Sequence, residues 1–276
     1  MFRTLNGKDW ESVSEPGFGS KRNTSGRGIV FFKGHIYVGT ENRLFGGQIW
    51  RHAVEDNGDL SPGKDWGEIY DTVFFDQNTM FTEFAVHNDG ADDYLYAGTM
   101  NRRSGSELWR SLDGEKWEVI YEKGNGIERD WAVMKMYSFN GLLYVGTMNF
   151  EEGTSLLVST DSSGTDFDFI FTKGNGNEFN IYIWAMMEYE GRLYMSTFKN
   201  CAECAKGFEI YSSEDPSRDD LTVETENAFG YSLGLFGIRS MAVHENHLIL
   251  GSSGAQPTVI FEAESLSMRN TTMNGK

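Results

Sequence analysis

Short apolar runs separated by turn-forming residues recur along this chain, and one run is repeated almost letter for letter. The sequence GHIYVGT at 34–40 returns as DYLYAGT at 93–99, GLLYVGT at 141–147, GRLYMST at 191–197 and NHLILGS at 246–252. The aligned residues Tyr37, Tyr96, Tyr144, Tyr194 and Ile249 are 59, 48, 50 and 55 positions apart. A period of this size indicates that one supersecondary unit is copied along the chain.

The copy from Met80 to Lys123 shows most clearly what one repeat contains. Four runs rich in aromatic and apolar residues, here called strands A to D, occupy 84–87, 94–99, 107–111 and 116–121. Turn formers separate them, and Asp113-Gly114 is typical of a hairpin between C and D. Four antiparallel strands repeated in this way are typical of the blades of a β-propeller. We therefore predict an all-β propeller of four-stranded antiparallel blades.

The repeats predict five blades in a single domain spanning residues 1–276. The blades cover about 24–75, 80–123, 131–173, 182–226 and 237–262. Residues 2–13 match 109–120 position for position, so they correspond to strands C and D alone. We expect them to complete the last blade and close the ring, because closure removes exposed sheet edges. The alternative is a fragment of a larger propeller, in which 258–262 is itself a strand C.

The charge limits the classes of partner. The net charge is −17, and the acidic residues are spread along the chain. This sign opposes binding to a nucleic acid or to an anionic membrane, and no basic cluster offsets it. No apolar run approaches the roughly 18 residues that a membrane span needs. We expect neither a nucleic-acid partner nor a membrane span.

The cysteine pair Cys201 and Cys204, in the B–C loop of the fourth repeat, leaves the location of the protein open. A local disulfide would place the chain in an extracellular or periplasmic compartment, whereas free thiols suit the cytoplasm. A metal shared with another chain is the third alternative, since one Cys-x-x-Cys cannot complete a four-ligand zinc site. No secretory signal pattern is visible at the start of the sequence.

The C–D hairpins carry a recognisable motif. Residues 111–117, SLDGEKW, are one residue shorter than the Asp-box pattern Ser-x-Asp-x-Gly-x-x-Trp, 159–167 is one residue longer, and 4–10 has Asn in place of Asp. The repeat thus resembles Asp-box and related bacterial β-propeller proteins. The resemblance implies that Asp113 and Asp161 are folding elements remote from the ligand face. Such families include sialidases, lectins and protein-binding platforms, so the fold does not transmit a function.

A ligand site is expected where the D–A connections and B–C loops open around the channel of a propeller. Candidates there are residues that differ from blade to blade. The candidate ligand-binding residues are Arg27, Trp131, Trp184, Tyr182, Arg239, Asn101 and Arg102. The alternative interpretation is structural: glycines of the D–A loops supply positive φ angles, and the recurring Asn42, Asn101 and Asn149 cap turns.

These residue types suit a glycan or a zwitterionic ligand, because they combine aromatic faces, amides and charges of both signs. The leading hypothesis is a non-catalytic propeller that binds a glycan, a small ligand or a protein partner. The alternative is a hydrolase or lyase acting on saccharides, with Glu83 and Asp130 as the catalytic pair. Glycoside hydrolysis needs two carboxyl groups about 5–9.5 Å apart. A purely structural domain of a longer polypeptide is the third possibility.

No cofactor or metal is expected. The histidines His35, His52, His87, His244 and His247 occupy matching repeat positions or stand alone, and no metal-binding histidine motif is present. Asp89, Asp92 and Asp93 leave Ca²⁺ open, although their spacing is not that of an EF-hand.

Overall fold

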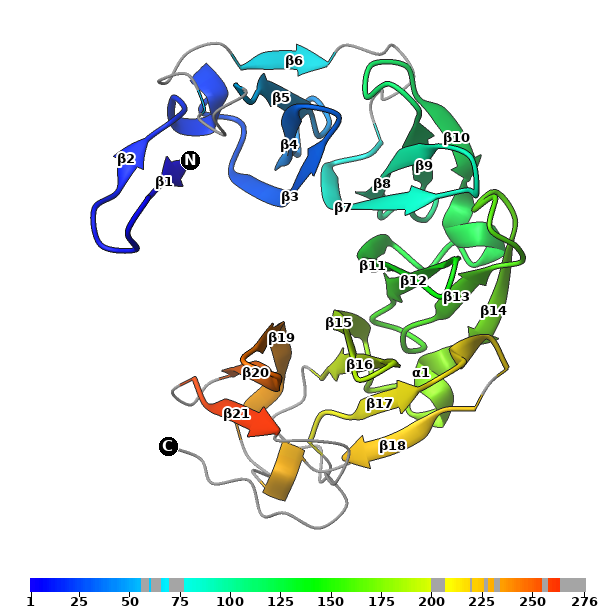
Figure 1. Cartoon of the computed structure of the whole chain (residues 1–276). Helices are drawn as coiled ribbons and strands as arrows, with labels where there is room; N and C mark the ends of the chain where they lie inside the picture. The colour runs from blue at the N-terminus through cyan, green and yellow to red at the C-terminus, as the bar shows by residue number, and fades with distance from the viewer. Residues whose placement is uncertain are drawn as a thin grey trace. The chain divides into compact units, whose positions relative to one another are not determined.

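The structure, a computed structural model, describes residues 1–55, 60, 66–69, 77–199, 207–218, 220–225, 228–230, 234–254 and 258–263. The chain divides into two compact units, Met1–Val133 and Met134–Lys276. Strands dominate both units (Figure 1). The helical elements of the described residues are single turns: η1 (Pro16–Gly19), η3 (Lys123–Gly126), α1 (Lys173–Gly176), η4 (Pro216–Arg218) and η5 (Ala228–Gly230).

The first unit contains two four-stranded antiparallel sheets in which each strand pairs with the next in sequence. The first sheet consists of β3 (Ser25–Phe32), β4 (His35–Glu41), β5 (Ile49–Ala53) and β6 (Gly67–Ile69). The second consists of β7 (Met80–Asn88), β8 (Asp93–Met100), β9 (Leu108–Ser111) and β10 (Glu118–Tyr121). A separate hairpin of β1 (Phe2–Arg3) and β2 (Glu11–Ser12) precedes them.

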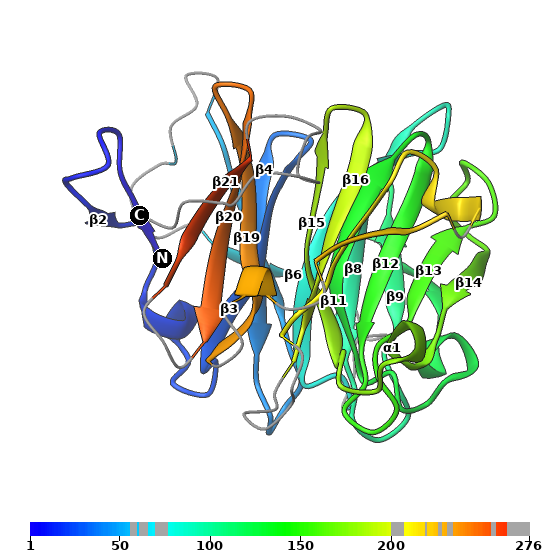
Figure 2. The ribbon, with the colours of Figure 1, turned by 90° about the horizontal axis from the view of Figure 1, so that it is seen from below.

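The second unit continues the pattern. Its first sheet has β12 (Leu142–Met148), β13 (Leu156–Ser159) and β14 (Phe167–Phe171) beside β11 (Ala132–Phe139), a strand that begins in the first unit. The next sheet has β15 (Tyr182–Tyr189), β16 (Arg192–Phe198), β17 (Ile210–Ser213) and β18 (Thr222–Thr225). The last has β19 (Leu235–His244), β20 (His247–Gly254) and β21 (Ile260–Ala263), which Figure 2 shows side by side.

These sheets confirm the predicted four-stranded repeat, but the A strands begin earlier than predicted. β7 begins at Met80 rather than at Phe84. The reason is a backbone bridge between successive sheets, in which the end of a B strand pairs with the start of the next A strand. The bridged pairs are Glu41 with Met80, Met100 with Ala132, Met148 with Tyr182, and Phe198 with Gly237.

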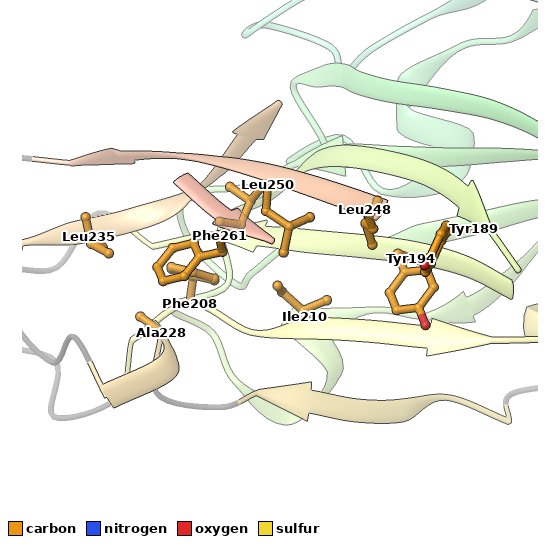
Figure 3. Close-up of a cluster of buried hydrophobic side chains, with 10 residues drawn as sticks. Tyr189, Tyr194, Phe208, Ile210, Ala228, Leu235, Leu248, Leu250 and Phe261 are labelled. Atoms are coloured by element: carbon orange, nitrogen blue, oxygen red, sulfur yellow. The ribbon is translucent and has the colours of Figure 1, made fainter. Parts of the chain in front are cut away.

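The hydrophobic core lies between successive sheets rather than inside one of them. One cluster joins Phe208 and Ile210 of the β15–β18 sheet region to Leu248, Leu250 and Phe261 of the β19–β21 sheet (Figure 3). The repeated Tyr37, Tyr96, Tyr144 and Tyr194 are all buried. Burial of these side chains away from water supplies the main stabilising term for such a stack of sheets.

The glycine of the repeated run allows this close approach. A Cβ atom on Gly98 would lie 2.4 Å from Cβ of Val133, and one on Gly146 would lie 2.5 Å from Cβ of Ile183. No real pair of carbon atoms tolerates such distances, so a side chain at either position would force neighbouring sheets apart. The repeated glycine is thus a packing residue.

The Asp-box-like hairpin has the structural role that the resemblance implies. Asp113 Oδ1 accepts hydrogen bonds from the backbone N–H groups of Glu115 and Lys116, and Gly114 N–H donates to Ser111 Oγ. In the N-terminal hairpin, Asn6 Oδ1 and Thr4 Oγ1 accept the equivalent bonds. Residues 2–13 therefore form the same hairpin as 109–120. Completion of the last blade by this hairpin, and the single domain of residues 1–276, stay predictions.

Candidate functional site

The D–A loops adopt the left-handed backbone that the glycine-based interpretation predicted. Lys123, Gly124 and Asn125 have φ angles of 56°, 59° and 55°, and the 173–175 loop repeats the same turn. Glycine adopts this region at little cost, whereas other residues do so only where the surrounding structure holds them. The loops are therefore rigid parts of the scaffold.

The recurring asparagines close the B–C loops. Asn42, Asn101 and Asn149 each accept two backbone N–H bonds from the residues two and three positions later. Asn101 is 0 % exposed, and its Nδ2 donates to Asn78 Oδ1 at 3.3 Å. The structure thus places Asn101, one of the candidate ligand-binding residues, inside the loop scaffold.

Asp130 occupies a buried scaffold position as well. It is 0 % exposed, and its backbone carbonyl accepts a hydrogen bond from Ser106 N–H at 2.8 Å. The equivalent residues at the other D–A loops, Asn23 and Asn180, use their amides to bind the carbonyls of Gly17 and Gly174. Burial, and after it the negative charge of Asp130, raises the pKa of the Tyr121 hydroxyl. Asp130 is therefore a carboxyl group held inside a loop.

A β-bulge interrupts the A strands near their starts. The bulged residues are Gly28 in β3, Thr82 in β7, Trp184 in β15 and Arg239 in β19. Bulges re-aim side chains and are common beside active sites. Two predicted residues, Trp184 and Arg239, are the bulged residues themselves, while Arg27 and Glu83 are their direct neighbours. The structure thus places four predicted residues at or beside the bulges of A strands, two of them in each unit.

In the first unit Arg27 belongs to a polar cluster, which we call the acidic–arginine cluster: Ser25, Arg27, Glu41 and Arg43. Glu41 Oε1 accepts a 2.6 Å bond from Arg43 Nε, and Glu41 Oε2 accepts a 3.1 Å bond from Ser25 Oγ. Burial would raise the pKa of Glu41, but these bonds and the charges of Arg43 and Arg27 outweigh it and lower that pKa. Glu41 is thus held ionised.

Glu83, in β7, lies beside the bulge of β3. A Cβ on the bulged Gly28 would lie 3.2 Å from Glu83 Cα, so only glycine lets β3 approach β7 this closely. Glu83 is half-buried, whereas Arg27 is exposed. The sequence comparison of repeats missed Glu41, although the signal was present. Glu41 stands where the other repeats have Met100, Met148 and Phe198, immediately before the loop asparagine or lysine.

In the second unit the equivalent positions form an aromatic cluster, made of Phe150, Tyr182, Trp184, Phe198 and Phe236. Tyr182 stacks on Phe198 with ring centroids 4.2 Å apart, and Trp184 meets Phe198 edge to face at 4.6 Å. Phe236, in β19, meets the Phe198 ring edge to face, with ring centroids 6.0 Å apart. Phe150 is 42 % exposed, and Tyr182, Trp184 and Phe236 are half-buried. The cluster therefore presents ring surface to solvent.

An arginine lies over a tryptophan in both units. Arg239 Cζ is 5.1 Å from the Trp184 ring centroid, and Arg102 Cζ is 5.7 Å from the Trp131 ring centroid. Cation–π contacts of this kind contribute about 0.5–1 kcal/mol at exposed sites. The structure thus brings four of the predicted residues together as two pairs, Arg102 with Trp131 and Arg239 with Trp184, which the sequence did not predict as pairs.

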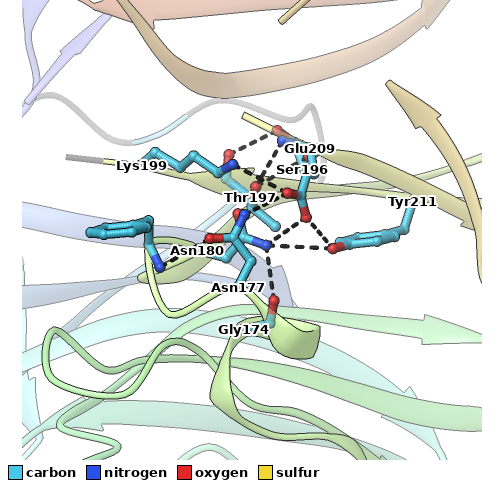
Figure 4. Close-up of polar contacts among 9 residues, drawn as sticks. Gly174, Asn177, Asn180, Ser196, Thr197, Lys199, Glu209 and Tyr211 are labelled. Atoms are coloured by element: carbon cyan, nitrogen blue, oxygen red, sulfur yellow. Dashed lines mark hydrogen bonds and ion pairs between the residues drawn. The ribbon is translucent and has the colours of Figure 1, made fainter. Parts of the chain in front are cut away.

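A buried polar network, shown in Figure 4, adjoins the aromatic cluster in the sequence at Lys199. Lys199, directly after Phe198, forms a 3.1 Å ion pair with Glu209, and both side chains are less than 10 % exposed. Glu209 also accepts hydrogen bonds from Asn177, Asn180 and Tyr211. The backbone N–H of Lys199 donates a 2.8 Å hydrogen bond to the carbonyl of Phe236. Because Lys199 directly follows Phe198, this bond links the backbone at Phe198 to the backbone at Phe236.

Within the described part of the chain, no group of three or more metal-ligating side chains occurs. Asp89 Oδ1 accepts the N–H groups of Ala91 and Asp92, and these bonds lower the pKa of Asp89. The acidic turn is thus closed by its own backbone. Cys201 and Cys204 lie outside the described residues. No helix among the residues described has the length and apolar character needed to cross a membrane.

Comparison with known proteins identifies the fold. No protein-family model and no curated protein sequence matches the chain. An α-L-arabinanase of Penicillium chrysogenum, solved with arabinobiose, is similar in structure with a TM-score of 0.55 at 15% identity, over 96% of this chain and 84% of that one. The GH62 α-L-arabinofuranosidase catalytic domain of Coprinopsis cinerea gives 0.52 at 10%, over 90% and 94%. The chain has the fold of the five-bladed β-propellers, as the repeat predicted.

Proposed function

We propose that this protein recognises a saccharide through the aromatic cluster of its second unit. The observation that carries the proposal is the set of partly exposed rings at Tyr182, Trp184 and Phe236, held by stacking on Phe198. Rings fixed in this way present an apolar surface to the CH face of a sugar at little entropic cost. Similarity in fold to an arabinanase and an arabinofuranosidase supports a saccharide over the other ligands considered.

Trp184→Ala should abolish most of this recognition. Truncating a central aromatic residue in a binding site costs about 2 kcal/mol or more, so binding should weaken at least about 30-fold. A glycan array followed by titration calorimetry on the strongest ligand measures the effect. Trp10→Ala is the matched control, because Trp10 is 61 % exposed on the N-terminal hairpin. Unchanged affinity in Trp184→Ala would contradict the proposal.

The second candidate function is hydrolysis of the saccharide, and the acidic–arginine cluster favours it. Retaining and inverting glycosidases use one ionised carboxylate and one carboxylic acid. The lowered pKa of Glu41 suits the ionised member, and half-buried Glu83 on the neighbouring A strand suits the proton donor. This pairing replaces Asp130, which is enclosed by its loop, with Glu41. The fold shared with an α-L-arabinanase and an α-L-arabinofuranosidase supports hydrolysis over binding alone.

If the protein hydrolyses the saccharide, one substitution should lower turnover without lowering binding affinity. Glu83→Gln should lower turnover by about 10²- to 10⁴-fold, the usual contribution of general acid–base catalysis, and leave binding in place. Release of reducing ends from a polysaccharide panel that includes arabinan measures turnover, and calorimetry measures binding. Glu115→Gln, on an exposed hairpin, is the control. Saccharide binding by the wild type without any turnover would reject hydrolysis and leave recognition standing.

A further inference from the structure

The arginines of this protein fall into two groups according to their partners. Those of the C strands, the C–D hairpins and the start of the fourth B strand hold carboxylates: Arg3 with Glu11, Arg51 with Glu115, Arg110 with Glu118, Arg192 with Glu214 and Arg218 with Asp215. Arg239 differs. It is exposed, and among the described residues it has no carboxylate within ion-pair distance.

Three features of the fold position Arg239 over the Trp184 ring: a bulge, a glycine and a neighbouring phenylalanine. Arg239 is the bulged residue of β19, and a bulge points a side chain away from the regular alternation of the strand. Gly237, two residues earlier, makes room for Trp184: a Cβ there would lie 3.0 Å from Trp184 Cε3. Phe198 then fixes the Trp184 ring at 85° to its own plane. The guanidinium therefore rests on a supported aromatic ring.

A guanidinium over an aromatic ring keeps its N–H groups available. Its five donors lie in its own plane, in a fork that matches the two oxygens of a carboxylate. With Cζ 5.1 Å from the centroid of the Trp184 ring and no carboxylate at ion-pair distance among the described residues, these donors are available to a ligand. Such bidentate charged bonds are among the strongest hydrogen bonds in proteins.

We infer that the saccharide taken by the aromatic cluster carries a carboxylate, as uronic and sialic acids do, and that Arg239 binds this carboxylate while the rings contact the sugar. The inference rests on the proposed function and narrows its ligand class. Attraction between a strongly acidic protein and an anionic sugar requires a local cation, and Arg239 supplies one at the cluster itself.

The experiment compares wild type, Arg239→Gln and Arg218→Gln on one array carrying neutral, carboxylated and sulfated glycans. Arg218 is the matched control because it is 81 % exposed and lies in η4 of the same unit. We expect carboxylated glycans to bind best and to lose about 10- to 100-fold in affinity in Arg239→Gln only, as loss of charged hydrogen bonds implies. Added salt should weaken the wild type toward the variant.

The other outcomes separate the inference from the proposed function. Binding confined to neutral glycans and lost in Trp184→Ala would overturn the inference and keep saccharide recognition. Preference for sulfated over carboxylated glycans would also overturn it, since the carboxylate would not be the recognised group. Equal loss in Arg239→Gln and Arg218→Gln would show a general charge effect and overturn it too. Absence of binding to every glycan would overturn both.

Discussion

Lys199→Met should lower the free energy of unfolding by about 3–5 kcal/mol, because it leaves the carboxylate of Glu209 buried without its cation. The 3.1 Å pair between Lys199 Nζ and Glu209 Oε1 lies almost wholly away from solvent. In water the lost attraction would be small, but burial makes the uncompensated charge expensive. Urea unfolding at pH 7, followed by tryptophan fluorescence, measures the loss.

The double variant Lys199→Met/Glu209→Leu is the control for this prediction. Removing both partners of a buried pair costs much less than removing one, since no charge is left behind. It should therefore recover a large part of the stability that Lys199→Met loses. Equal destabilisation of the single and the double variant would contradict the ion-pair explanation and assign the effect to packing of the lysine stem.

The pH dependence of stability has a definite sign. Burial alone would raise the pKa of Glu209, but the hydrogen bonds from Tyr211 and Asn180 and the charge of Lys199 outweigh it and lower that pKa. A lowered native pKa contributes stability above the unfolded value of about 4.3 and loses it as the pH falls through the native value. Removing Lys199 takes away one cause of that lowering, so the contribution of Glu209 should fade at a higher pH in Lys199→Met than in the wild type.

The fold could be predicted from the sequence because its main signal is local and repeated. Tyr37, Tyr96, Tyr144 and Tyr194 mark the B strands, and Asp113-Gly114 marks a hairpin; each is readable from a few neighbouring residues. The starts of the A strands were not readable in this way. Their first pairs, such as Glu41 with Met80, depend on contact with the preceding sheet.

The candidate site could be predicted only in part. Trp184, Arg239 and Glu83 were found because they differ between repeats, and difference is what a site on a repeated scaffold requires. Asp130 also differs between repeats, yet its side chain is buried in its loop. The sequence shows only that Asp replaces the Asn of the other loops, and this change does not reveal that the side chain is buried. The bulges could not be predicted, because one extra residue in a short strand does not change the pattern of apolar and polar residues in a recognisable way. The buried pair of Lys199 with Glu209 could not be predicted either, because it depends on the pairing of β16 with β17.

The packing of the Asp-box-like hairpin leads to the second large effect, in Gly114→Ala. Gly114 has a φ angle of 75°, and an added Cβ would lie 1.9 Å from the hydroxyl oxygen of Tyr37 in the preceding sheet. A left-handed alanine costs about 1–2 kcal/mol, and overpacking of a tight contact adds about 1–3 kcal/mol. We expect a total loss of about 2–5 kcal/mol, measured as a shift of the urea midpoint at constant slope.

Two further variants separate the backbone cost of Gly114→Ala from its packing cost. Tyr37→Phe/Gly114→Ala removes the hydroxyl oxygen that meets the new methyl group, so it should recover part of the packing cost and keep the backbone cost; Cζ of the Tyr37 ring would still lie 2.6 Å from the added Cβ. Gly7→Ala is the matched control, because Gly7 occupies the same turn with a φ angle of 72° and has nothing within 4 Å of its Cβ position. It should therefore show the backbone cost alone. If Gly7→Ala and Gly114→Ala lose the same stability, the repeated tyrosine does not hold the hairpin of the next blade, and its burial must have another cause.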